Sequence, residues 1–119
     1  MIKGIGIDII ELARIKQSMN KQQRFVKRIL TEKELEHYDT LPNEKRQIEY
    51  VAGRFAAKEA VAKATGRGIG ELSFQHIEIL VQESGAPYMA VQGYETDKIH
   101  VSISHSEHYA VAQVIIETL

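Results

Sequence analysis

Cysteine is absent from the 119-residue chain, and so is tryptophan. Without cysteine, disulfide frameworks, zinc fingers, iron–sulfur clusters and thiol nucleophiles are excluded. Long apolar runs are absent too: the longest stretch free of Asp, Glu, Lys and Arg is residues 84–94, whereas a membrane-spanning helix needs about 20 apolar residues. The first eleven residues carry Asp8 inside their apolar run and do not resemble a secretory signal. We therefore expect a cytoplasmic protein.

Charge is distributed unevenly, although the net charge is only −1. Residues 12–31 contain six basic and no acidic side chains, which leaves nine basic and 16 acidic residues elsewhere. A compact basic patch on a nearly neutral protein indicates a local anionic partner rather than general coating of nucleic acid. Arg14, Lys21 and Arg28 are spaced by seven, so a continuous helix would align them on one face. A solvated helix face is the alternative interpretation.

The hydrophobic pattern predicts a strand, then helices, then further strands. Thr31 and Glu34 match a capping box, and Gly66 is a stop signal for the longest helix. Composition is ordinary for a globular protein, with 44% hydrophobic and 26% charged residues. This order favours a single α+β domain, residues 1–119, with an antiparallel sheet packed against a long helix. Strands are expected at 2–10, 74–82, 88–91, 99–104 and 109–116, the last two as an antiparallel hairpin, and helices at 11–19, 22–29, 31–39 and 44–65.

Asp8 is unusual because it lies in the middle of the first predicted strand, where aspartate is disfavoured. Strand alternation places three isoleucines on one face, expected to be the packed face, and Asp8 on the other face with Gly4 and Gly6. Glycines within a strand usually mark the close approach of a ligand or of another backbone. A functional role for Asp8 and a structural role, such as capping a helix or pairing with a lysine, fit this pattern equally well.

Glu59 is the second unusual acid, since it falls within the apolar face of the predicted long helix, between Phe55 and Ala62. Burial of an uncompensated carboxylate is costly. A helix pair between Glu59 and Lys63 is the simple explanation. The alternative is that Asp8 and Glu59 converge on Mg²⁺, which keeps waters and shares its coordination shell with substrate phosphates.

Basic side chains and glycines near Glu59 favour a phosphate-binding role. Segment 66–70 is rich in glycine, which lets backbone N–H groups approach a phosphate, although helix termination explains Gly66 equally well. Ser102, Ser104 and His105 end a predicted strand; the two serines are interpreted as edge hydroxyls or as donors to a ligand, because the glycine-flanked serine of a hydrolase is missing. The basic side chains around Glu59 are Arg54, Lys58, Lys63 and Arg67.

Four segments carry a specific combination of motifs. They are Gly4-Ile5-Gly6-Ile7-Asp8-Ile9-Ile10-Glu11, Arg28-Ile29-Leu30-Thr31-Glu32-Lys33-Glu34, Arg54-Phe55-Ala56-Ala57-Lys58-Glu59-Ala60-Val61-Ala62-Lys63-Ala64 and Ser102-Ile103-Ser104-His105. In this order they resemble the bacterial holo-[acyl-carrier-protein] synthases, the small single-domain 4′-phosphopantetheinyl transferases. The resemblance covers essentially the whole chain and implies the 4′-phosphopantetheinyl transferase fold.

The resemblance implies transfer of 4′-phosphopantetheine from coenzyme A to a serine of apo acyl carrier protein. The reaction releases adenosine 3′,5′-bisphosphate and supports fatty acid biosynthesis. Mg²⁺ is the implied cofactor, with Asp8 and Glu59 as metal ligands and Lys63 beside the phosphate as the third catalytic residue. The base is left open, because the ordinary lysine pKa of about 10.4 is too high at neutral pH unless the site lowers it. Further expected contacts to coenzyme A are Lys45, Arg46, Arg54, Lys58, Gly66, Ser104 and His105.

The resemblance also implies a protein partner and an assembly. Acyl carrier proteins are small and acidic, so the basic patch is expected to dock their serine-bearing helix. A homotrimer with each active site between two protomers is implied. The almost continuously apolar strand at 109–116, interrupted by Gln113, supports an interface that buries its second face. Neither nucleic acid nor a membrane is expected as a partner. The expected docking residues are Arg14, Lys21, Arg24 and Arg28.

Two other functions fit parts of the pattern. A non-enzymatic module that binds an acidic protein or nucleic acid explains residues 12–31 but neither Asp8 nor Glu59. A Mg²⁺-dependent phosphohydrolase acting on a nucleotide would use the same carboxylates without needing the basic patch. The residues without the resemblance indicate only a metal and phosphate site with an anionic partner.

Overall fold

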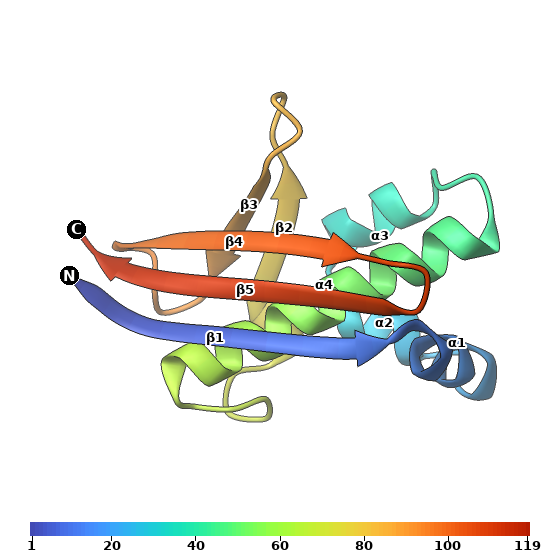
Figure 1. Cartoon of the computed structure of the whole chain (residues 1–119), viewed down its shortest axis with the longest axis horizontal. Helices are drawn as coiled ribbons and strands as arrows, with labels where there is room; N and C mark the ends of the chain where they lie inside the picture. The colour runs from blue at the N-terminus through green and yellow to red at the C-terminus, as the bar shows by residue number, and fades with distance from the viewer.

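A computed structural model describes all 119 residues and has the predicted order of strand, helices and strands (Figure 1). Strand β1 (Ile2–Glu11) leads into four helices: α1 (Leu12–Lys21), α2 (Phe25–Ile29), α3 (Glu32–Tyr38) and α4 (Glu44–Thr65). A 3₁₀ turn, η1 (Phe74–His76), precedes β2 (Ile77–Val81), β3 (Pro87–Val91), β4 (Asp97–His105) and β5 (Tyr109–Thr118).

The strands form two antiparallel sheets. The larger sheet has the order β1-β5-β4, and β2 and β3 form a separate two-stranded sheet. Figure 1 shows the three long strands side by side in front of α4, with the β2–β3 hairpin crossing behind them and both chain termini at one end of the sheet. The predicted α+β class, the antiparallel sheet on a long helix and the β4–β5 hairpin are confirmed.

Helix α4 is the element around which the core assembles. The Asn43 side chain accepts a hydrogen bond from Arg46 N at its start, and Gly66 ends the helix with a left-handed φ of 74°. The predicted stop at Gly66 is therefore confirmed. Alanines on several sides of α4 let both sheets approach it closely. The main core cluster combines Ala56, Ala57, Ala60 and Val61 with apolar residues of β2, β3 and β5.

Two local expectations are refined by the structure. The capping box is present: Thr31 Oγ1 accepts from Glu34 N, and the Glu34 carboxylate accepts from Thr31 N. The strand expected from Phe74 begins at Ile77, because the Ser73 side chain caps η1 first.

The basic segment does not form one continuous helix. The backbone is extended at Gln22, which separates α1 from α2. Alignment of Arg14, Lys21 and Arg28 on one helix face, which requires a continuous helix, therefore does not hold. None of the helices has both the length and the apolar character that a membrane crossing requires.

Candidate active site

Asp8 lies on the face of β1 that packs against α4. The glycines on the same face explain this packing: a Cβ on Gly4 would overlap the carbonyl oxygen of Ala64, and a Cβ on Gly6 would overlap that of Ala60. The close approach indicated by the glycines is thus an approach to the α4 backbone. The expectation that the isoleucine face of β1 is the packed one is wrong within a single chain, because only the glycine face leaves room for the helix.

Lys63 joins α4 to Asp8. Its Nζ donates to Asp8 Oδ1 and to the carbonyl oxygen of Ile7, both at 2.9 Å. Lys63 thus forms its ion pair with Asp8, and not with Glu59 as the simpler of the two interpretations of Glu59 had it. Burial raises the pKa of Glu59 above its usual value, the nearby Asp8 charge raises it further, and Lys63 opposes both effects. The fold therefore brings together the three residues predicted to be catalytic.

The Asp8–Glu59 pair fits a divalent cation. Burial and, after it, the Asp8 charge raise the pKa of Glu59, and a cation between the two carboxylates would relieve their repulsion. There is no cluster of three or more His, Asp or Glu side chains arranged to hold a metal. Mg²⁺ suits such a sparse set, since it is often bound by one or two carboxylates and completes its shell with water and phosphate oxygens.

A second group of expected contacts lies at the other end of α4. Glu49 connects them: its carboxylate is 3.7 Å from Arg46 Nε and 3.7 Å from His105 Nδ1. At a rise of 1.5 Å per residue, Arg46 and Glu59 are about 20 Å apart along the helix. A single chain therefore does not bring these residues, or the neighbouring Lys45, to the carboxylate pair.

Ser104 lies on the opposite face of the β1-β5-β4 sheet from α4. It is exposed and pairs across the strands with Val111, on the outward-facing side. Gly66 instead follows the helix turn that carries Lys63 and donates its N–H to the Lys63 carbonyl oxygen at 3.2 Å. Gly66 is thus on the same end of α4 as Lys63, about 10 Å along the helix from Glu59.

Arg54 faces α3 and β2, away from Asp8. Its guanidinium lies 4.1 Å from the ring centroid of Tyr50, and its buried Nε has no hydrogen-bond partner in the chain. A buried N–H without an acceptor is costly. An anionic group bound beside Arg54 would satisfy it, which keeps the expected phosphate contact of Arg54 chemically reasonable.

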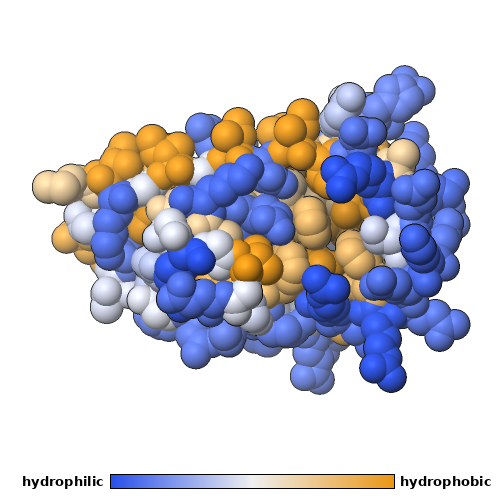
Figure 2. All heavy atoms as spheres, turned by 90° about the horizontal axis from the view of Figure 1, so that it is seen from below, coloured by the Kyte–Doolittle hydropathy of each residue, from blue (hydrophilic) through white to orange (hydrophobic).

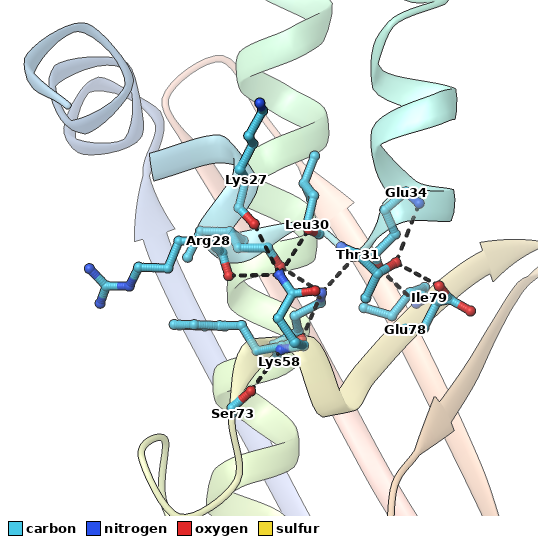
Figure 3. Close-up of polar contacts among 12 residues, drawn as sticks. Lys27, Arg28, Leu30, Thr31, Glu34, Lys58, Ser73, Glu78 and Ile79 are labelled. Carbon is cyan, nitrogen blue, oxygen red and sulfur yellow. Dashed lines mark hydrogen bonds and ion pairs between the residues drawn. The ribbon is translucent and has the colours of Figure 1, made fainter. Parts of the chain in front are cut away.

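Lys58 does not fit its expected role as a coenzyme A contact. The side chain is fully buried, and its Nζ donates to Glu34 Oε1 at 2.6 Å, to Ile29 O at 2.7 Å and to Phe74 O at 3.1 Å (Figure 3). Burial lowers the pKa of Lys58, while the Glu34 carboxylate opposes this shift. All three ammonium protons are used inside the protein, so none is left for a phosphate.

Glu34 completes this buried cluster, and the sequence pattern identified only half of its role. Besides Lys58, its carboxylate accepts from Thr31 N and from Ile79 N, both at 2.8 Å. The capping-box motif located the first contact. The partnership with Lys58 spans 24 residues, and no local pattern indicates it.

The expected docking residues are all exposed on the α1–α2 end of the molecule. Arg14 and Lys21 line a common surface depression on α1. Arg24 immediately precedes α2, and Arg28 lies in its last turn. No acidic side chain forms a salt bridge with any of the four, which leaves them available to an anionic partner.

The outward face of the β1-β5-β4 sheet is an exposed apolar surface. Ile5, Ile7 and Ile9 are 56–62% exposed. Gln113 lies in the middle of this face, between Ile7 on β1 and Ser102 on β4. Figure 2 shows hydrophobic side chains gathered along one edge of the molecule. An apolar face of this kind marks an interaction surface.

Comparison with known proteins agrees with the fold and identifies the family of the chain. Residues 4–114 match the family model of the 4′-phosphopantetheinyl transferase superfamily. Holo-[acyl-carrier-protein] synthases are 58% identical in Anoxybacillus flavithermus, over 100% of this chain and 98% of the relative, and 55% identical in Oceanobacillus iheyensis, over 99% and 98%.

A solved structure shows the same architecture. The holo-(acyl-carrier-protein) synthase of Bacillus anthracis, in complex with CoA (3′,5′-ADP), superposes with a TM-score of 0.91 at 49% identity, covering 100% of this chain and 99% of that one. The chain belongs to the 4′-phosphopantetheinyl transferase superfamily and, within it, to the holo-[acyl-carrier-protein] synthase family of enzymes.

Proposed function

We propose that this chain transfers the 4′-phosphopantetheine group of coenzyme A to a serine hydroxyl of apo acyl carrier protein and releases adenosine 3′,5′-bisphosphate. The observation that carries the proposal is the meeting of Asp8, Glu59 and Lys63 between β1 and α4, in a chain whose relative binds CoA (3′,5′-ADP). The serine oxygen forms the new bond to phosphorus, the bridging pyrophosphate bond breaks, and the serine proton leaves to a base. Fatty acid synthesis is the proposed use of the product, and the cytoplasm is its predicted location.

The residues of the site would contribute in two ways, by compensating charge and by positioning the substrate. Asp8 and Glu59 would hold Mg²⁺, which neutralises charge on the pyrophosphate during phosphoryl transfer. Lys63 is held at Asp8 and at the Ile7 carbonyl oxygen, so its ammonium is oriented beside the place where a phosphate oxygen would bind. Positioning and charge compensation are the main protein contributions to this class of reaction.

The reaction itself is tested by its second product. With coenzyme A, apo acyl carrier protein and Mg²⁺, we expect adenosine 3′,5′-bisphosphate to appear in equal amount to the carrier consumed. Removal of the carrier or addition of EDTA is expected to stop its release. Breakdown of coenzyme A without carrier would instead establish the phosphohydrolase alternative, and no reaction in any mixture would leave the binding-module alternative.

We further propose that each site is shared between two copies of the chain in a homotrimer. Lys45 and Arg46 lie about 20 Å along α4 from Glu59 of their own chain. His105 lies beside Glu49, about 15 Å along α4 from Glu59. A neighbouring copy packed on the isoleucine face would supply such residues from a different direction and bury the exposed apolar surface. Gln113 then has the position to form a hydrogen bond between copies.

Ile5→Glu tests the assembly. Because Ile5 is 56% exposed in the single chain, the substitution should leave the fold intact while placing a charge in the interface. We expect light scattering to give three chains for the wild type and for the control Ile5→Val, and one chain for Ile5→Glu. A single-chain mass for the wild type, or an unchanged mass for Ile5→Glu, would contradict the proposal.

Carrier docking on the basic patch is tested by Arg14→Glu. Charge reversal at an exposed position of α1 should weaken recognition of the acidic carrier and leave coenzyme A binding unaffected. We expect the KM for carrier to rise by about tenfold or more, with less effect at high salt. Lys33→Glu makes the same charge change at an exposed position of α3, outside the basic patch and the outward sheet face, and serves as the control. Equal increases in KM for carrier and for coenzyme A would refute the docking assignment.

A further inference from the structure

Helix α2 is too short to hold its own position. It has five residues, Phe25–Ile29, and isolated helices of this length are unstable in water. The last carbonyl groups of any helix also lack partners within the helix. The place of α2, and of the basic side chains it carries, must therefore be set by contacts from elsewhere in the fold.

Two side chains from distant segments bind the C-terminal carbonyl groups of α2. Gln75 Nε2, in η1, lies 3.0 Å from Lys27 O, 3.2 Å from Arg28 O and 3.0 Å from Leu30 O. Lys58 Nζ, in α4, donates to the carbonyl oxygen of Ile29 at 2.7 Å. These two side chains thus lie against four consecutive carbonyl groups at the end of α2, and the two Nε2 hydrogens of Gln75 are shared among three of them.

The cap is itself fixed to the catalytic helix. Lys58 immediately precedes Glu59 on α4, and its ammonium is held by Glu34 in a cluster with no solvent access. Apolar contacts also hold the start of α2, where Phe25 packs 6.4 Å from the Phe55 ring of α4. In Figure 3 the Arg28 side chain extends away from the cap, on the side opposite Glu34. Arg28 is therefore connected to Glu59 through a short chain of contacts: the end of α2 is bound by Lys58, and Lys58 is next to Glu59 on α4.

We propose that Gln75 is a positioning residue for the protein substrate: together with Lys58 it caps α2 and sets the place of Arg28 relative to the carboxylate pair. The inference rests on the proposed carrier docking at Arg28. The reacting serine belongs to the docked protein, so the docking residue must lie at a fixed distance from the site of phosphoryl transfer. None of the expected coenzyme A contacts lies on α2, which predicts separate effects on the two substrates.

Gln75→Leu removes the donor at an exposed position, and Gln92→Leu is the matched control because Gln92 is exposed and its side chain has no hydrogen bond within the chain. For Gln75→Leu we expect the KM for carrier to rise by about tenfold, the loss that two neutral hydrogen bonds would explain. The KM for coenzyme A and kcat should stay within about twofold. Hydrogen exchange should become faster at the amides of Arg28 and Leu30 but not along α4.

The variant Arg28→Ala distinguishes a failure of the Gln75 positioning role from a failure of the proposed transferase function. If Gln75 acts through Arg28, the two substitutions are coupled, and Gln75→Leu should raise the carrier KM much less in the Arg28→Ala background. An unchanged carrier KM in Gln75→Leu, or additive effects of the two substitutions, would overturn the positioning role while leaving transfer established. The positioning role of Gln75 would also be overturned if Arg28→Ala left the KM for carrier unchanged. Absence of transfer by the wild type would instead refute the proposed function and this role together.

Discussion

Glu59→Gln is expected to reduce the rate of phosphopantetheine transfer by about a thousandfold, the scale of losing a preorganised electrostatic contact to the reacting group. The same substitution is expected to stabilise the metal-free protein. Burial and the Asp8 charge raise the pKa of Glu59 above its ordinary value of 4.5, so the folded state binds this proton more tightly than the unfolded state. The stabilising effect of that proton is complete at acidic pH and is lost as the pH rises through the folded pKa.

At neutral pH the ionised Glu59 therefore costs stability, and a neutral glutamine removes the cost. We expect the metal-free Tm to rise by a few degrees, about 1–4 °C. Mg²⁺ is expected to raise the Tm of the wild type but not that of Glu59→Gln. Thermal unfolding with and without Mg²⁺ measures both effects. Glu107→Gln, at an exposed turn, is the control. A lower metal-free Tm, or retention of transfer by Glu59→Gln, would contradict the carboxylate-pair assignment.

Lys58→Met is expected to have the largest effect on stability. Removing one partner of a buried ion pair leaves the other charge uncompensated, at a cost of about 3–5 kcal/mol. Glu34 would lose the ammonium 2.6 Å from its Oε1, and the Ile29 and Phe74 carbonyl groups would lose their donor. Against a typical free energy of unfolding of about 5–15 kcal/mol, this is a large fraction.

The double variant Lys58→Met with Glu34→Gln shows whether the cost comes from the unpaired charge. Glutamine is neutral and keeps an acceptor for the capping contact, so we expect the double variant to recover at least half of the stability lost in Lys58→Met. Urea unfolding of the two single variants and the double variant gives the coupling free energy. A Lys58→Met variant with the unfolding free energy of the wild type, or strictly additive losses, would argue against the buried pair.

Local patterns predicted the fold and the carboxylate pair well because their signals lie within a few residues. The Thr31–Glu34 capping box and the Gly66 stop signal each fix a helix end through neighbouring atoms. Strand alternation likewise placed Asp8 on the glycine face of β1. Strand alternation did not determine which face of β1 packs against α4, because an apolar face is suited to an interface between chains as well as to a core.

Long-range pairings could not be predicted in the same way. Lys58 and Arg54 are four residues apart on α4. The sequence pattern does not distinguish them, since both are basic residues that precede a glycine-rich segment. Their difference comes from Glu34, which binds Lys58 across 24 residues, and from Tyr50, which stacks on Arg54. The cap formed by Gln75 spans 45 to 48 residues. An isolated glutamine in a sequence has no local feature that indicates such a contact.

The most direct test of the central claim is the intact mass of acyl carrier protein after incubation with this chain, coenzyme A and Mg²⁺. The account predicts that the carrier gains the mass of one phosphopantetheine on its serine, that EDTA prevents the gain, and that Glu59→Gln and Asp8→Asn do not produce it in the same time. An unmodified carrier with the wild-type chain, or an equal gain with the two variants, would contradict the assignment of transfer to the Asp8–Glu59 site.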